Sequence, residues 1–166
     1  MSAIDQRLAE LRIVAHGTPK PKGSLRHVGR GRLIEQVKGS KPWREALVIA
    51  AARARDQAGW ECLTGAVSVA CVAVIPRPKT VRRDYPITRS SGDCDKLARN
   101  LLDALVDAQI MTDDAQVVDL WIRKEYTDTR HGMTGMYVTV RTFPGPVDNV
   151  VDWLETMARG TYDELH

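Results

Sequence analysis

The stretch GDCDKLARNLLDALVDAQIMTDDAQVVD, residues 92–119, predicts a helix, a turn and a strand in succession. Apolar residues recur in it at helical spacing, which predicts a helix over residues 95–108. They are Leu97, Leu101, Ala104, Leu105 and Ala108. Thr112, Asp113 and Asp114 are typical of a turn, and residues 117–126 are typical of a strand. The stretch therefore predicts a helix that folds back against a sheet.

Acidic residues bracket this predicted helix. Asp93 and Asp95 come just before it, and Asp113 and Asp114 come just after it. In an extended chain, residues two apart point to the same face, so the carboxylates of Asp93 and Asp95 are expected to share one target. If the helix folds back through the turn, Asp114 is expected to join them, giving three carboxylates around a point. Coordinates that place Asp114 far from the other two would rule out the chemistry that follows.

Three carboxylates with few competing histidines suit Mg²⁺, a hard cation that prefers oxygen ligands. A metal held there would polarise a phosphodiester and activate water. A purely structural interpretation remains open, because Asp is common in turns and at helix N-termini. Asp95 in particular is expected near the N-terminus of the helix, where a carboxylate is favourable without any function.

Length and composition indicate one folded domain. The chain has 166 residues, of which 43% are hydrophobic, enough for a single sizeable core. Its three cysteines have no CxxC spacing, which favours a reduced, cytoplasmic setting. The N-terminus lacks the apolar run of a signal peptide. The longest apolar run, residues 66–75, is too short to cross a membrane and predicts a buried strand.

Positive charge is concentrated in two segments. Residues 19–44 contain eight basic residues against Glu35, a balance of +7, and residues 76–92 contain five against Asp84, a balance of +4. Because the whole chain carries +3, the remainder carries 3 − 11 = −8. Two basic loops in an otherwise acidic chain predict a polyanion partner, bound in a salt-dependent way. A merely solvated loop is the alternative for the first segment.

The remaining patterns complete an α/β (α+β) fold with one mixed sheet. A second helix is expected over 41–58, opened by Pro42, and a C-terminal helix after the FPGP sequence at 143–146. The expected strands are 11–16, 66–75, 117–126 and 136–143. We therefore divide the chain into a domain of residues 1–143 and an acidic helical extension of residues 144–166.

At residues 93–119 the pattern DxDKLxRxLLDAL, a short turn and DDAQVVD resembles the RusA-type Holliday junction resolvases, often carried by phages and prophages. The likeness extends over roughly residues 11–142 and includes the G-x-P-x-P-K-G opening of the first basic loop. It implies a Mg²⁺-dependent homodimer, with Mn²⁺ as a possible substitute, that nicks four-way DNA junctions. Asp93, Asp95 and Asp114 match the metal-binding acids of the family, with Asp113 assisting or setting the turn.

One position departs from the family. Where its best-known member has an essential lysine, this chain has Arg99, and Lys96 is the other candidate for the catalytic cation. Arg and Lys are not equivalent at a phosphate, so both stay open. The basic residues expected to contact DNA are Lys20, Lys22, Arg26, Arg30, Arg32, Arg82, Arg83 and Arg89.

Two other functions fit the same residues. The first is a DNA-binding protein without catalysis, in which the acids serve only as caps and turns. The second is a metal-dependent phosphoesterase on small molecules, against which the two basic loops argue, since a small substrate needs few cations. The expected partners are four-way or other branched DNA and a second copy of the chain, with no membrane.

Overall fold

Four strands form a mixed sheet in the order β1-β6-β4-β5. The computed structural model describes residues 10–23, 25–27, 33–35, 38–127 and 133–143. Strand β4 pairs in parallel with β5 and antiparallel with β6, which in turn pairs antiparallel with β1. The strands are β1 (Glu10–His16), β4 (Val67–Ile75), β5 (Val117–Tyr126) and β6 (Gly135–Thr142). The predicted mixed sheet is therefore confirmed, and its four strands lie where the sequence placed them.

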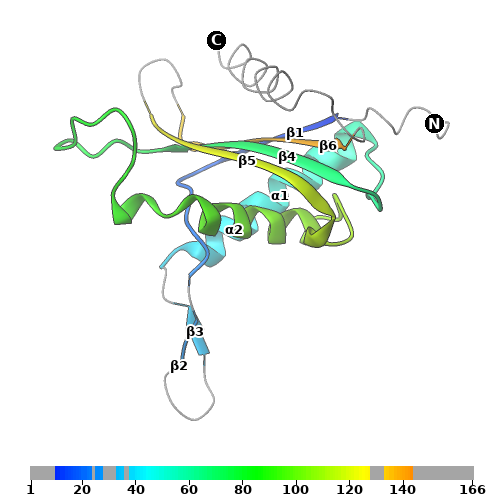
Figure 1. Ribbon diagram of the computed structural model, residues 1–166, viewed down its shortest axis with the longest axis horizontal. Helices are drawn as coiled ribbons and strands as arrows, with labels where there is room; N and C mark the ends of the chain where they lie inside the picture. The colour runs from blue at the N-terminus through cyan, green and yellow to red at the C-terminus, as the bar shows by residue number, and fades with distance from the viewer. Residues whose placement is uncertain (1–9, 24, 28–32, 36–37, 128–132, 144–166) are drawn as a thin grey trace.

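Two helices cover one face of this sheet (Figure 1). In α1 (Ser40–Ala58) the buried residues Trp43, Leu47 and Ala51 recur every four positions, and the helix ends at Gly59 in the left-handed conformation. Helix α2 (Cys94–Asp107) buries Leu97, Leu101, Ala104 and Leu105. Both helices lie within one residue of their predicted bounds. The core lies between them and the sheet.

Strand β4 is the centre of the fold, because all nine of its residues are buried. A fully buried strand that is apolar at every position but Ser68 is typical of a sheet interior. Helix α2 connects β4 to its parallel neighbour β5, so the chain leaves one end of β4 and returns to the other. Residues 92–119 therefore extend along the helix-covered face of the sheet, from one end of β4 to the start of β5.

The first basic segment carries two short strands, β2 (Leu25–His27) and β3 (Leu33–Glu35), which pair antiparallel. Its glycines and prolines were expected to exclude long regular structure, and each strand has only three residues. Figure 1 shows this hairpin projecting away from the sheet, beyond the helices. We call β2 and β3 together the arm.

Some predictions lie outside the described residues. These are the C-terminal helix, the extension 144–166, Arg30 and Arg32. Among the helices that are described, none combines the length and apolar character needed to span a membrane. The three cysteines are all free.

Candidate active site

A tightly held turn delivers the chain to Asp93. Gly92 has φ +77°, and a Cβ at this position would lie 2.9 Å from Cγ of Pro21, so only glycine fits without strain. The hydroxyl of Ser91 donates to the carbonyl oxygen of Thr88 at 2.7 Å. Lys124, on β5, donates from Nζ to the carbonyl oxygen of Gly92 at 2.7 Å and to Oγ of Ser91 at 3.2 Å. Local and long-range contacts therefore fix the backbone just before Asp93.

Asp93 is the N-cap residue of α2, yet its side chain makes no capping hydrogen bond. Instead its Oδ2 accepts a hydrogen bond of 2.8 Å from Nζ of Lys96. This bond, together with the charge of Lys96, lowers the pKa of the Asp93 carboxyl, and the charges of Lys124 and Arg89 lower it further. A structural capping role thus does not account for Asp93, whose carboxylate is exposed among cations.

Lys96 interacts electrostatically with the other charged residues near the N-terminus of α2. Its pKa is raised by the hydrogen bond to Asp93 and by the charge of that carboxylate, and Asp95 raises it further. Arg99 acts on it in the opposite direction. The carboxylates of Asp93 and Asp95, which we call the acid pair, therefore both act on the ammonium group of Lys96. Asp93, Asp95 and Arg99 are all exposed, so a bound polyanion can reach them.

Replacing Lys96 with methionine is expected to raise the pKa of Asp93 towards its ordinary value, because both the hydrogen bond and the nearest positive charge are lost. The Asp93 carboxyl would then become protonated at a higher pH than in the wild type. Titration of the side-chain carboxyl by NMR measures this shift. Arg99→Met is the matched control, since Arg99 acts on Lys96 and is not among the causes for Asp93. An Asp93 titration unchanged by Lys96→Met would contradict this account.

Asp113 and Asp114 lie at the other end of α2, at the start of a short 3-10 helix, η3 (Asp114–Gln116). The side chain of Asp113 accepts a hydrogen bond of 2.7 Å from the amide of Ala115, and Gln116 completes a capping box. The turn role predicted for Asp113 is therefore confirmed. Asp114 is exposed beside it.

The expected convergence of three acids within one chain is wrong. Helix α2 has 14 residues, which makes it about 21 Å long, and it separates Asp95 from Asp114. Strand β5 runs back along it, so Lys124 near the end of β5 reaches Gly92, whereas Asp114 precedes the start of β5. Within the described ranges, no three Asp, Glu, His or Cys side chains come together in a group that could hold a metal ion.

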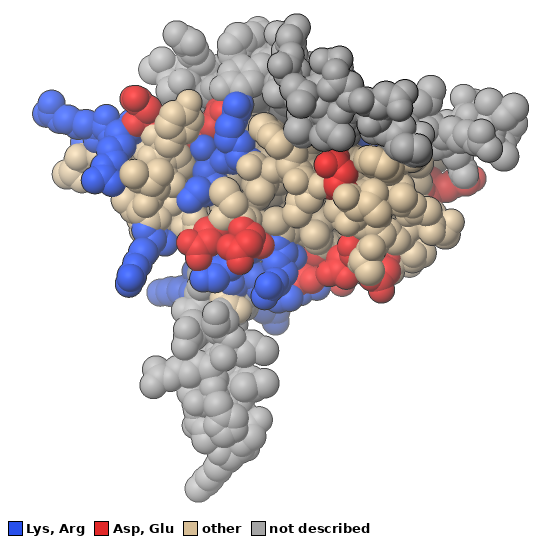
Figure 2. Space-filling view, in the orientation of Figure 1, with Lys and Arg blue, Asp and Glu red and all other residues tan. Residues whose placement is uncertain are grey.

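The residues predicted to contact DNA lie in three parts of the structure. Arg82, Arg83 and Arg89 are exposed on the loop between β4 and α2. In Figure 2 most blue side chains lie in the left half of the view, around this loop, the start of α2 and the base of the arm. Lys20 and Lys22 lie at that base, and Lys22 forms a salt bridge with Asp103. Arg26 belongs to β2.

Two residues were absent from the sequence-based prediction: Lys124, which holds the backbone just before Asp93, and Asn100, which binds the segment that enters the arm. Lys124 was read only as part of a strand, although a lysine two residues from Ile122 on the helix-facing side of β5 is a signal for a buried hydrogen-bond partner. Asn100, 1% exposed, sits on the buried side of α2 and binds the base of the arm. A polar residue within an apolar helical stripe is the corresponding signal.

One comparison with known proteins identifies a family for this chain. A search of the curated proteins finds no significant match. Among protein families, residues 16–141 match the family described as Endodeoxyribonuclease RusA. The matched segment begins at the last residue of β1 and ends within β6, so it contains the arm, both helices, the basic loop between β4 and α2, and all four acids. Because it spans well over half of the sequence, the chain belongs to the RusA family of endodeoxyribonucleases.

Proposed function

We propose that this endodeoxyribonuclease resolves four-way DNA junctions by paired symmetric nicks, with a divalent cation, in DNA recombination and repair. The observation that carries the proposal is the exposed pair Asp93 and Asp95, set among Lys96, Arg89 and Arg99 beside the basic loop. Metal-dependent hydrolysis of a phosphodiester needs acids that hold the metal and cations that hold phosphates in the same place. Lys96 or Arg99 is suited to steady the charge on the phosphate.

The donor set for a metal is incomplete within one chain. Carboxylate oxygens suit Mg²⁺, with Mn²⁺ as a substitute, but the described part of one chain has no group of three acids. We therefore assign the metal to Asp93 and Asp95 of one copy with Asp114 of a second, Asp113 holding the turn. When bound, a divalent cation supplies a Lewis acid that stabilises negative charge on the phosphate.

A symmetric homodimer meets this requirement. A twofold axis perpendicular to α2 sets two copies of the helix antiparallel, so that the start of one lies beside the end of the other. Strand β5 follows Asp114 and lies at an edge of the sheet, where Val118 and Leu120 are 59% and 43% exposed. Apolar side chains on an exposed edge strand support a partner at that edge. Two sites per dimer match the two strands that must be nicked in a junction.

Removal of the metal is expected to abolish cleavage and to spare binding. A synthetic four-way junction with labelled strands is incubated with wild-type protein in Mg²⁺, in Mn²⁺, or in EDTA at fixed ionic strength. Two symmetric nicks are expected with either metal, none in EDTA, and full recovery when Mg²⁺ is restored. A linear duplex of the same sequence is the control. Cleavage that persists in EDTA would rule out the proposed chemistry.

A non-catalytic junction-binding protein is the second candidate, and the separation of the acids within one chain favours it. It predicts a salt-sensitive gel shift with no product in any metal. The same reactions therefore separate the two candidates. We also propose a cytoplasmic location, in a bacterium or a phage-infected cell, which the three free cysteines support.

A further inference from the structure

The arm has little structure of its own to fix its direction. Its two strands pair over only three residues each, and an isolated two-stranded hairpin is marginally stable in water. Figure 1 shows it standing clear of the sheet and both helices. The direction of the arm is therefore fixed at its base. We define the base as residues 20–23, which lead into the arm, and the start of α1, which follows the arm.

The base is bound to α2 at successive residues. Pro21 packs against Gly92, immediately before Asp93. The amide of Lys22 donates to the carbonyl oxygen of Lys96 at 3.0 Å. Nδ2 of Asn100 donates to the carbonyl oxygen of Lys20 at 3.0 Å. The backbone that enters the arm thus runs along the same turns of α2 that follow the acid pair.

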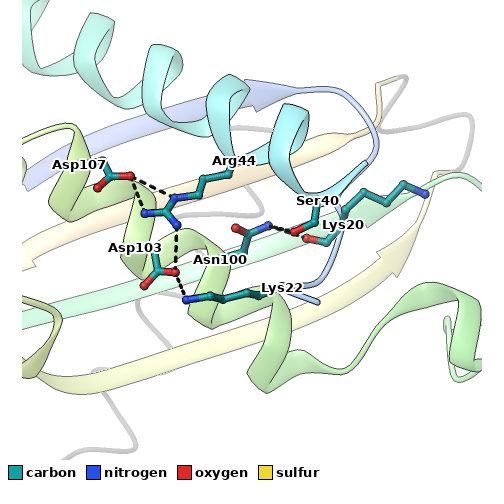
Figure 3. Close-up of polar contacts among 7 residues, drawn as sticks. All are labelled: Lys20, Lys22, Ser40, Arg44, Asn100, Asp103 and Asp107. Carbon is teal, nitrogen blue, oxygen red and sulfur yellow. Dashed lines mark hydrogen bonds and ion pairs between the residues drawn. The ribbon is translucent and has the colours of Figure 1, made fainter. Parts of the chain in front are cut away.

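Asp103 joins the two sides of the base. Its Oδ2 accepts from Nζ of Lys22, on the incoming side, and from Nη1 of Arg44, on α1, at 3.4 Å. Arg44 also donates from Nε and Nη2 to Oδ2 of Asp107 at 3.1 and 2.6 Å. Figure 3 shows Arg44 between the two carboxylates and Lys22 reaching only Asp103. We call Lys22, Arg44, Asn100 and Asp103 the anchor.

The anchor borders an open part of the structure. A cavity of about 770 Å³ lies beside the anchor, lined in part by Lys22, Arg44, Val48 and Asn100. The side chain of Asp103 is 18% exposed, against 48% for Asp107. Ion pairs at partly buried groups are screened less than those at the surface, so the contacts of Asp103 constrain the base more than those of Asp107.

We propose that Asp103 and Asn100 are positioning residues that set the direction of the arm, which carries Arg26, relative to Asp93 and Asp95, and that this fixed direction gives the protein its preference for branched DNA. The inference rests on the junction-cutting function proposed above. A duplex can be bound by positive charge alone. A junction presents two backbones at a defined angle, and a pre-oriented arm and active site engage both without a further ordering cost.

Asp103→Asn, with Asp107→Asn as matched control, tests this proposal. Each variant removes one negative charge from the same face of α2 and one partner of Arg44, but only Asp103 also contacts Lys22, on the segment that enters the arm. Affinities for a four-way junction and a duplex are measured in EDTA at one salt concentration. The ratio of junction to duplex affinity is expected to fall about tenfold in Asp103→Asn, because ordering the arm then costs affinity only for the junction. In Asp107→Asn it should match the wild type.

Two further variants and a hydrogen-exchange measurement keep the test independent of charge and of folding. Lys22→Gln breaks the same ion pair from the other side and should lower the ratio as Asp103→Asn does, whereas Asp103→Glu keeps the charge and should largely restore it. Hydrogen exchange without DNA should quicken in peptides covering β2 and β3 of Asp103→Asn and stay unchanged in β4.

The outcomes separate the two proposals. A wild type that prefers the junction, with equal ratios in Asp103→Asn and Asp107→Asn, overturns the anchor and leaves the function standing. A wild type that binds junction and duplex equally overturns the proposed function, and with it the role of the anchor in selectivity. A selective loss of the ratio in Asp103→Asn and Lys22→Gln, with faster exchange in the arm, supports both.

Discussion

Asp95→Asn is expected to lower the rate of junction cleavage by at least about a hundredfold while leaving junction binding within a few-fold of the wild type. Loss of a group that merely orients a metal ligand costs ten- to a hundredfold, and loss of a ligand itself should cost more. Asparagine has almost the same size as aspartate, and Asp95 is exposed in the first turn of α2. The cost in stability is therefore only that of one charge at a helix N-terminus, about 0.3–1 kcal/mol.

The measurement is a single-turnover cleavage assay with Mg²⁺ beside a gel shift in EDTA. Asp107→Asn is the control, since it makes the same substitution on an exposed residue at the other end of α2. Its cleavage rate should stay near that of the wild type. If Asp95→Asn cuts as fast as the wild type, the acid pair is not the catalytic site.

The largest gain of activity is expected from mixing two inactive variants. When Asp95→Asn and Asp114→Asn chains are unfolded and refolded together at equal amounts, half of the dimers contain one of each. In each mixed dimer one site carries both substitutions, and the other combines an intact Asp93 and Asp95 with an intact Asp114. One site in two is then restored in half of the dimers, so about a quarter of wild-type nicking is expected for sites shared across a twofold axis.

The product of this mixture should be singly nicked junctions, since each active dimer has one working site. Mixing Asp93→Asn with Asp95→Asn is the control. Both changes then fall in the same half of the site, so no dimer regains a complete set and no recovery is expected. Recovery in neither mixture would mean that the site does not combine acids from two chains, contrary to the proposed dimer.

Local patterns in the sequence were sufficient for the elements of the fold. The apolar recurrence at Leu97, Leu101 and Leu105 marks the buried side of α2, and the run of β4, apolar except for Ser68, marks the centre of the sheet. Both signals are local, because burial of one face or of a whole strand constrains every residue along it. The family resemblance, too, is confirmed by a match that covers the same region.

The position of Asp114 could not be obtained in the same way. The sequence predicts that Asp114 lies close to Asp93 and Asp95 because the chain reverses direction after α2. Such a reversal at the end of a rigid helix brings the chain back to the start of the helix only at the far end of the following strand. Lys124, ten residues after Asp114, is the part of β5 that reaches Gly92. The contact of Lys22 with Asp103 joins residues 81 apart in the sequence, and no local pattern predicts such a pair. The roles of the candidate site residues in metal and DNA binding stay predictions.

The length of α2 sets a spacing in the proposed dimer. If two antiparallel copies of this helix each contribute an end to both sites, then the distance between the two cuts is fixed by a rigid rod of 14 residues and not by a loop. Adding or removing one turn would move the cuts by about 5.4 Å relative to each other, whereas the basic loop could change in length without altering that separation. In the proposed dimer, the length of this helix would thus set the distance between the two active sites to match the geometry of the proposed branched substrate.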